Sequence, residues 1–134
     1  MKLTRSVSYA VGILLRVQSS KSGAPMTATA IAEGCDFPPR FLYRVLRRMV
    51  DAGLINGISG PGGGYSLAKP AKDISMLDVV NAVEGPLVAT ELEPVNSKQK
   101  KSIAAINTLC AENAAVFSQE LSKLNLLKLA TNGK

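Results

Sequence analysis

Residues 38–65 read PPRFLYRVLRRMVDAGLINGISGPGGGY, and this stretch decides the fold. At 100° per residue its first part forms a helix with two distinct faces. One face is polar and basic, and the other is apolar and suited to packing on a small core. Prolines at the start suit the entry turn of this helix, and Gly53 suits its exit. The polar face holds Arg40, Tyr43, Arg44, Arg47 and Asp51, and the apolar face holds Leu42, Val45, Leu46 and Met49.

Two short apolar runs, 54–59 and 65–68, follow the basic helix and predict a pair of strands. The segment between them, 60–64, reads GPGGG and predicts a flexible hairpin tip. A glycine-rich loop can also cradle a nucleotide phosphate, but here no Lys-Ser or Lys-Thr pair and no helix follows the loop. A hairpin tip with almost no side chains can instead approach a sugar-phosphate backbone closely. The combination predicts a recognition helix followed by a wing.

These segments resemble the Rrf2 family of bacterial winged helix-turn-helix transcription regulators. The resemblance rests on MKLT at 1–4, YA at 9–10, AIA at 30–32, AGLI at 52–55 and VEG at 83–85, and above all on GPGGGYSLA at 60–68. It is strong over residues 1–85 and weak beyond them. It implies a DNA-binding protein that dimerises through a long helix near the C-terminal end.

Composition agrees with a protein of one domain plus an appended element. The chain has 134 residues, of which 46% are hydrophobic, with few aromatic residues and no Trp, so we expect an aliphatic core. It has no apolar run long enough for a membrane span and no signal-peptide pattern, so we expect no membrane partner and a cytoplasmic location. Two cysteines are too few for a disulfide framework and suit a reducing compartment.

The net charge of +6 is unevenly distributed along the chain. Residues 1–72 hold ten Lys or Arg against three acids, a balance of +7, whereas residues 73–134 hold six against seven, a balance of −1. The excess lies in the part that contains the basic helix and the hairpin. This asymmetry points to a polyanion as the partner of the first part and to a different role for the second.

Capping residues predict the remaining helices of the first domain. Thr4 can cap a helix that runs to about Gln18, Thr27 a short helix over 28–33, and Ser75 a helix that ends near Glu84. The short helix, a turn over 34–37 and the basic helix form a helix-turn-helix. We therefore expect a mainly α (α+β) fold with a winged helix-turn-helix domain over 1–85, a two-stranded wing and a long C-terminal dimerisation helix.

The resemblance assigns residues to the DNA interface. By residue-for-residue match, the family's base-reading positions fall on Arg40, Tyr43 and Arg44, and arginine suits bidentate contact with guanine. Tyr9 is equally expected to be a half-buried packing residue. Ser59 replaces an arginine that relatives often carry in the wing, which places minor-groove insertion in doubt. The expected contacts with the DNA backbone are Lys2, Thr4, Arg5, Tyr9, Arg47, Arg48, Ser59, Gly60, Gly62 and Gly63.

Residues 86–97 form the predicted linker, where the family resemblance implies iron–sulfur ligands. Relatives that bind a cluster place three cysteines in and just beyond this segment, but here the linker has none. Cys110 stands alone, the chain has no histidine, and Ala104 takes the position of the last ligand. We therefore expect neither an iron–sulfur cluster nor any other metal or cofactor.

Residues 98–134 are expected to dimerise the protein. Ser97 can cap a helix that runs to about Leu121, and a short helix over 124–130 is expected to pack back on the dimer. The resemblance implies that two copies of the long helix cross. Cys110 is expected either to pack in this interface or to form an intermolecular disulfide. The predicted dimerisation residues are Ile103, Ile106, Cys110, Phe117 and Leu121.

The sequence thus favours a homodimeric transcription regulator that binds a palindromic site in double-stranded DNA. The alternative is a winged-helix module whose basic face binds an acidic protein partner. Without histidine, paired carboxylates or an activated nucleophile, we expect no enzymatic activity. The signal stays open, and a small-molecule effector between the winged domain and the long helix is one of the alternatives.

Overall fold

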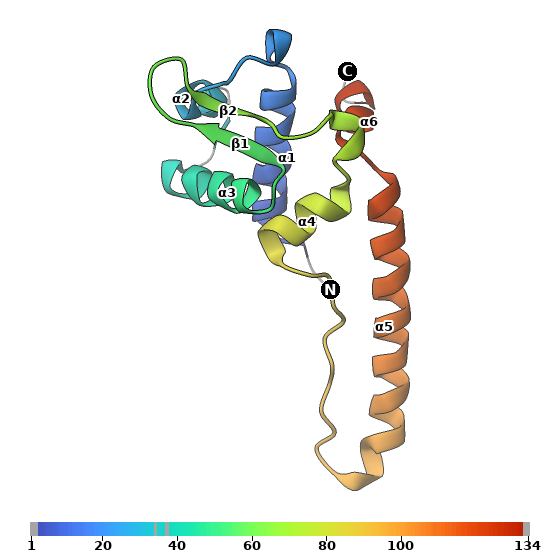
Figure 1. Cartoon of the computed structure of the whole chain (residues 1–134). Helices are drawn as coiled ribbons and strands as arrows, with labels where there is room; N and C mark the ends of the chain where they lie inside the picture. The colour runs from blue at the N-terminus through green and yellow to red at the C-terminus, as the bar shows by residue number, and fades with distance from the viewer. Residues whose placement is uncertain (1–2, 34, 37, 133–134) are drawn as a thin grey trace.

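The computed structural model describes residues 3–33, 35–36 and 38–132, so Lys2 lies outside the described residues. The chain folds into a winged helix-turn-helix domain from which a long arm extends (Figure 1). This architecture confirms the predicted mainly helical fold with a two-stranded wing. The helices are α1 (Arg5–Gln18), α2 (Ala28–Ala32), α3 (Pro39–Asp51), α4 (Met76–Glu84), α5 (Lys100–Lys123) and α6 (Leu126–Asn132), the strands are β1 (Ile55–Ile58) and β2 (Gly64–Leu67), and short 3-10 turns lie at η1 (Lys21–Gly23), η2 (Ala71–Asp73) and η3 (Ser97–Gln99).

An aliphatic core lies between α1, α3 and α4. All three helices contribute apolar faces to it, because their apolar residues recur at helical spacing. Ile13 of α1, Met49 of α3 and Val80 of α4 have no exposed surface. No charged or polar residue among those described is fully buried, so apolar packing holds these helices together.

Side-chain caps fix where three of the helices begin, as the sequence predicts. Thr4 accepts a hydrogen bond from the Ser6 amide at the start of α1, and Thr27 accepts one from the Ala30 amide at the start of α2. Ser75 and Asp78 form a reciprocal capping box on α4. These bonds satisfy amides that have no partner within the helix.

The helix-turn-helix is tied to α1 by a polar contact. Arg16 of α1 donates a hydrogen bond of 2.7 Å from Nη2 to the carbonyl oxygen of Ala30 in α2. Ile31, on the same short helix, is completely buried. A helix of five residues is too short to be stable alone, so these contacts hold α2 in front of α3.

The wing is an antiparallel pair in which Ile55 faces Leu67 and Ile58 faces Gly64. Met26, just before α2, forms an isolated antiparallel β-bridge with Tyr65. The Met26 amide donates to the Tyr65 carbonyl at 2.9 Å, and the Tyr65 amide donates to the Met26 carbonyl at 2.8 Å. The wing is therefore joined directly to the start of the helix-turn-helix.

The C-terminal end of the chain packs on the winged domain of its own protomer. The Met76 amide donates to the Leu124 carbonyl at 2.7 Å, and the Leu126 amide donates to the Ile74 carbonyl at 2.9 Å. Leu126 is almost fully buried, and α6 contacts α1 and η2. The last helix thus packs on the winged domain of its own chain, and its expected packing on the dimer stays a prediction.

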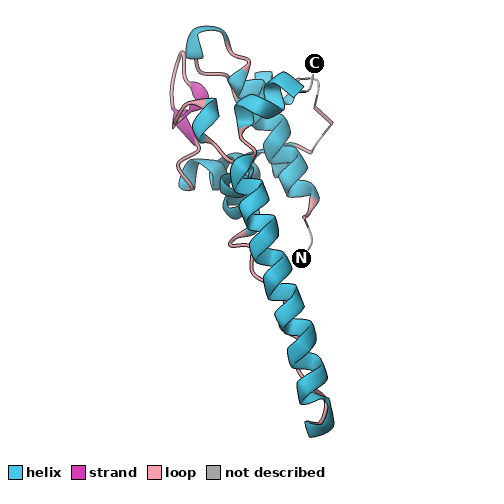
Figure 2. Cartoon of the chain, turned by 90° about the vertical axis from the view of Figure 1, so that its right-hand side faces the viewer, coloured by secondary structure: helices cyan, strands magenta, loops and turns pink. Residues whose placement is uncertain are grey.

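The linker runs beside the first half of α5, and together they form an arm that extends from the winged domain (Figures 1 and 2). Asn107 of α5 holds the linker with both amide atoms: Oδ1 accepts from the Leu92 amide at 2.8 Å, and Nδ2 donates to the Leu92 carbonyl at 3.0 Å. The prediction that Ser97 caps the long helix is wrong, because α5 begins at Lys100 and its N-cap residue, Gln99, makes no side-chain hydrogen bond. Asn96 caps the preceding turn η3 by accepting a hydrogen bond from the Lys98 amide. Ser97 instead begins the short turn η3 that precedes α5.

In the part of the chain that the structure describes, no helix is both long enough and apolar enough to cross a lipid bilayer.

Candidate nucleic-acid interface

The basic side of α3 is exposed along its length. Arg40, Arg44 and Arg47 are exposed, and Tyr43 has 58% of its surface exposed. Over residues 3–33, 35–36 and 38–132 the single ion pair joins Lys123 to Glu120, far from α3 in the sequence. The arginines of α3 are therefore not neutralised by a carboxylate within the described protomer, which leaves a positive surface for a polyanion.

Arg48 points away from this basic side. Its Nη1 donates a hydrogen bond of 2.6 Å to the carbonyl oxygen of Val83 in the last turn of α4. A cation at a helix C-terminus is favourable, and it satisfies a carbonyl that has no partner within the helix. This bond gives Arg48 a structural role, because its guanidinium joins α3 to α4, and this role competes with the expected contact to the DNA backbone.

Thr4 is also used inside the protomer. It caps α1, and its hydroxyl and amide both bond to the Glu84 carboxylate at the end of α4. A carboxylate thus occupies the favourable position at the α1 N-terminus that a phosphate would otherwise take. This arrangement argues against Thr4 as a contact to DNA. Arg5, one residue further on, is exposed and stays a candidate.

Tyr9 lies half-buried on α1 and packs against the core, which agrees with the packing alternative. Its ring also faces Phe41, which lies on α3, with the two ring centroids 6.1 Å apart. Phe41 has 38% of its surface exposed and was not among the residues chosen from the sequence. The only feature of the sequence that could have identified Phe41 was its position in the first turn of the basic helix.

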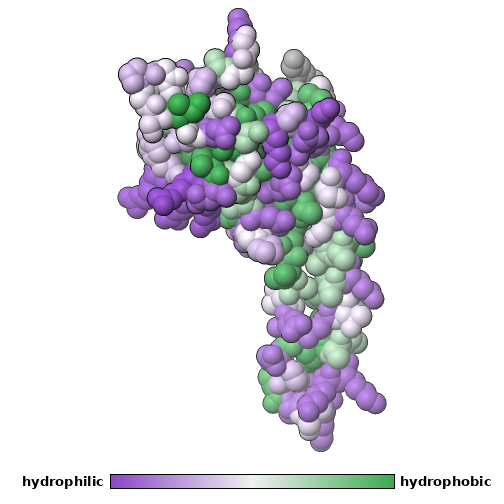
Figure 3. All heavy atoms as spheres, viewed as in Figure 1, coloured by the Kyte–Doolittle hydropathy of each residue, from purple (hydrophilic) through white to green (hydrophobic). Residues whose placement is uncertain are grey.

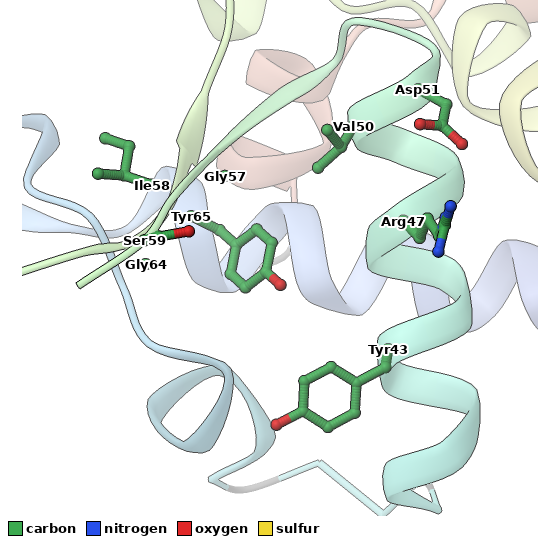
Figure 4. A pocket seen from close by; sticks show the side chains of 9 residues that line it. All are labelled: Tyr43, Arg47, Val50, Asp51, Gly57, Ile58, Ser59, Gly64 and Tyr65. Carbon is green, nitrogen blue, oxygen red and sulfur yellow. The ribbon is translucent and has the colours of Figure 1, made fainter.

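A groove of about 600 Å³ separates α3 from the wing (Figure 4). Tyr43 and Tyr65 direct their rings into the space between the two elements, and Arg47 and Asp51 border it from α3. Tyr65 lies opposite Gly57 in the hairpin, and a Cβ on Gly57 would be in ordinary contact with the Tyr65 ring, at 3.5 Å. Sequence reasoning missed Tyr65 because only the hairpin register brings its side chain opposite Gly57.

The tip of the wing exposes backbone and little else. Ser59, Gly60 and Gly62 are exposed, and the two glycines have φ of +87° and +75°, which L side chains rarely adopt. Gly63 is closely packed, since a Cβ there would lie 2.2 Å from the Ile58 carbonyl oxygen. The tip is thus a narrow loop whose backbone can approach a polyanion closely.

The stripe of α5 that was predicted to contact the partner subunit faces the same chain in its C-terminal part. Leu121 is only 9% exposed and belongs to the core, and Phe117 is half-buried against it. We therefore remove Leu121 from the expected interface. Ile103 and Cys110 are half-exposed, and Ile106 is 43% exposed.

A neighbouring apolar face of α5 is open. Ile106, Leu109 and Val116 are 43%, 59% and 57% exposed. At 100° per residue, Leu109 and Val116 lie roughly 100–120° around the helix from Phe117 and Leu121, and Ile106, a member of the predicted stripe, lies between the two sets. Val88 and Val95 of the linker are 73% and 82% exposed on the same arm. Hydrophobic side chains are visible along the arm in Figure 3. An unpaired apolar surface of this kind marks an interaction site.

Comparisons with known proteins agree with this fold and show the family of the chain. The Rrf2 family model, described as an iron-dependent transcriptional regulator, matches residues 3–132. The HTH-type transcriptional regulator IscR of Yersinia pestis is 29% identical over 132 residues, which are 98% of this chain and 80% of the relative. YwgB of Bacillus subtilis is 36% identical over 85 residues, 63% of this chain. Those residues are 54% of YwgB, so the match spans about half the length of that relative.

Solved structures share the fold at low sequence identity. The CymR structure of Bacillus subtilis aligns with a TM-score of 0.78 at 21% identity and covers 98% of both chains. The IscR structure of T. potens aligns with a TM-score of 0.69 at 19% identity and covers all of this chain and 89% of that one. The winged domain and the long helix thus occur together in these proteins.

Proposed function

The chain belongs to the Rrf2 family of transcriptional regulators, and from this premise we propose that it binds a palindromic DNA site as a homodimer. The supporting observation is the uncompensated basic face of α3 beside the α3–wing groove. A helix of this kind, second in a helix-turn-helix, fits the major groove of DNA. The wing then lies over the neighbouring sugar-phosphate backbone.

Each exposed residue of the face has a proposed role. Arg40, Tyr43 and Arg44 lie on the side of α3 that would face the base edges, and Arg44 would bond to guanine O6 and N7. Arg47 borders the groove and, with Arg5 at the start of α1, would contact phosphates. Tyr65 adds a hydroxyl on the wing side of the same groove. The exposed backbone around Gly60 and Gly62 would lie against the sugar-phosphate backbone.

Dimerisation is proposed to use the open face of the arm. A palindromic site requires two recognition helices about one turn of DNA apart, and a second copy related by a two-fold axis supplies the other helix. The exposed apolar side chains of α5, Ile106, Leu109 and Val116, would pack against their counterparts in that copy. Ile103 and Cys110 would lie at the edge of this contact.

The donor set of the chain does not fit an iron–sulfur cluster, although the family is described as iron-dependent. Such clusters are held by cysteine thiolates, four in the common types. The chain has two cysteines, Cys35 before α3 and Cys110 within α5, and no histidine. Within the described residues no three His, Cys, Asp or Glu side chains group closely enough to hold a metal. We propose that this protein regulates transcription without a cluster.

A small-molecule effector is proposed to bind beside the linker. A groove of about 360 Å³ lies between Leu87 and Val88 of the linker and Ala111 and Ala115 of α5. A ligand in this groove would contact both parts of the arm and change the position of the linker on α5. The lining of the groove combines these apolar side chains with the polar side chains of Glu91, Asn107 and Ser118.

Selection of bound duplexes from a random DNA pool at physiological salt tests the proposed function. The expected result is an enriched palindrome whose half-sites lie about one helical turn apart. The absorption spectrum of the same preparation is expected to lack the visible bands of an iron–sulfur cluster. If no duplex is enriched and heparin removes all of the bound DNA, the alternative of an acidic protein partner is favoured.

Arg44→Ala is expected to lower the affinity for the selected site by about 1–3 kcal/mol and to relax selectivity at one base pair. The reason is the loss of a bidentate contact that only one base pair satisfies. Binding curves on the selected duplex and on its three variants at that pair measure the effect. Parental affinity and selectivity in this variant would show that the reading face is wrongly assigned.

Arg47→Ala and Arg48→Ala form a matched pair of adjacent arginines with different expected effects. Arg47→Ala should weaken binding to all duplexes alike and lower the slope of log K against log salt by about 1. Arg48→Ala should leave that slope unchanged, because its guanidinium is bonded to the Val83 carbonyl, and should lower the free energy of unfolding by about 1–2 kcal/mol. Equal salt slopes for the two variants would contradict this division of roles.

A further inference from the structure

Two aromatic rings connect basic residues of α1 with basic residues of α3. The Tyr9 and Phe41 ring centroids lie 6.1 Å apart, and their planes are tilted by 39°. The guanidinium carbon of Arg5 lies 5.8 Å from the Tyr9 centroid, and that of Arg44 lies 5.6 Å from the Phe41 centroid. We call Tyr9 and Phe41 the aromatic bridge. Each ring of this bridge thus carries one arginine within the range of a cation–π contact.

The position of Phe41 is not explained by the core. Leu42, Val45 and Leu46, its neighbours on α3, are 3%, 2% and 1% exposed, whereas Phe41 keeps 38% of its surface in solvent. Aromatic pairs and contacts between arginine and a ring give a half-exposed ring favourable partners at a helix surface. Here the ring has Tyr9 on the neighbouring helix and Arg44 one turn further along its own helix.

The contact restricts a side chain that is otherwise free to move. Arg44 is exposed, has no ion-pair partner within the described residues, and would sample many rotamers in solution. The planar guanidinium stacks well on an aromatic face and keeps its hydrogen-bond donors in a fixed fork. A guanidinium already oriented by a ring loses less entropy when it binds a base.

We infer that Phe41 is a specificity-determining residue that positions Arg44 for reading DNA, and that Tyr9 supports the Phe41 ring from α1. The inference rests on the proposed function of Arg44 as a base-reading residue. Phe41 itself acts through Arg44 and need not contact a base. The aromatic bridge also links base reading on α3 to the proposed phosphate contact at Arg5, so both arginines are oriented by one pair of rings.

The test compares Phe41→Leu with Phe41→Tyr in the full chain. Leucine keeps an apolar, helix-favouring side chain but has no aromatic face, whereas tyrosine keeps the face. Phe41→Leu is expected to lower discrimination at the base pair read by Arg44 about two- to fivefold, with unchanged affinity for unrelated duplexes. Phe41→Tyr is expected to keep the discrimination of the parent.

A double-mutant cycle separates positioning from general packing. In the Arg44→Ala background, Phe41→Leu is expected to cause no further loss of discrimination. An equal loss with and without Arg44, or no loss in the single variant, would overturn the inference while leaving the base-reading role of Arg44 intact. If Arg44→Ala alone keeps full selectivity, both the proposed reading face and this inference fail.

A measurement without DNA gives an independent readout. In NMR spectra of the free protein, the Arg44 Nε–Hε signal is expected to be shifted by the ring current of Phe41, to move in Phe41→Leu and to stay near its parental position in Phe41→Tyr. Thermal unfolding is recorded first, and Phe41→Met replaces Phe41→Leu if the latter does not fold. An Arg44 signal that is the same in the parent and in the ring-free variant would overturn the inference.

Discussion

Gly64→Ala is expected to lower the free energy of unfolding by about 2–5 kcal/mol, because a methyl group has no room there. A Cβ on Gly64 would lie 2.6 Å from the Met26 carbonyl oxygen and 2.7 Å from its carbon, closer than real contacts allow. Gly64 also has φ of +143°, which L side chains rarely adopt. Relief of the clash would break the two hydrogen bonds between Met26 and Tyr65 and detach the wing from the helix-turn-helix.

Urea unfolding followed by circular dichroism measures this effect, and Gly12→Ala is the matched control. Gly12 lies inside α1, and a Cβ there meets no atom within 4 Å. Alanine favours the helix over glycine by about 0.5–1 kcal/mol, so the control is expected to be slightly more stable than the parent. Parental stability of Gly64→Ala would mean that the wing can move away from Met26 at little cost.

Leu109→Asp is expected to convert the proposed dimer into a monomer and to weaken binding to the palindromic duplex by about 10²–10⁴-fold. The leucine is 59% exposed at the centre of the open face of α5, and a carboxylate buried between two copies would be desolvated without a partner. A monomer also loses the gain in affinity that comes from binding two linked half-sites. Sedimentation velocity measures the oligomeric state, and binding to duplexes with one and two half-sites measures the affinity.

Leu127→Asp provides the control for this prediction. Leu127 lies on α6, away from the arm, and is 43% exposed. The same change of side chain there is expected to leave both mass and affinity unchanged. If Leu109→Asp stays dimeric, the dimer interface must be formed by the stripe that includes Ile103 and Cys110, and the open face of α5 binds another partner.

Whether a site residue could be predicted from the sequence depends on how far along the chain its contacts lie. The exposure of Arg40, Arg44 and Arg47 follows from their spacing on one amphipathic helix, so the sequence was enough to place them on one face. The role of Arg48 depends on Val83, 35 residues away along the chain, and no local pattern encodes that contact. Tyr65 and Phe41 were missed for the same reason, because their partners come from other elements.

The sequence by itself determined the helices, the caps of α1, α2 and α4, the hairpin and the basic face, because helix periodicity, capping and glycine conformation act over a few residues. Tertiary structure decided which faces remained open. Leu121 and α6 reach the core of their own winged domain, so the C-terminal part of the predicted stripe is occupied within the chain, whereas Leu109 and Val116 on a neighbouring face of α5 are left exposed. Burial depends on contacts between residues far apart in the chain, and for that reason it could not be read from the spacing of apolar residues along one helix.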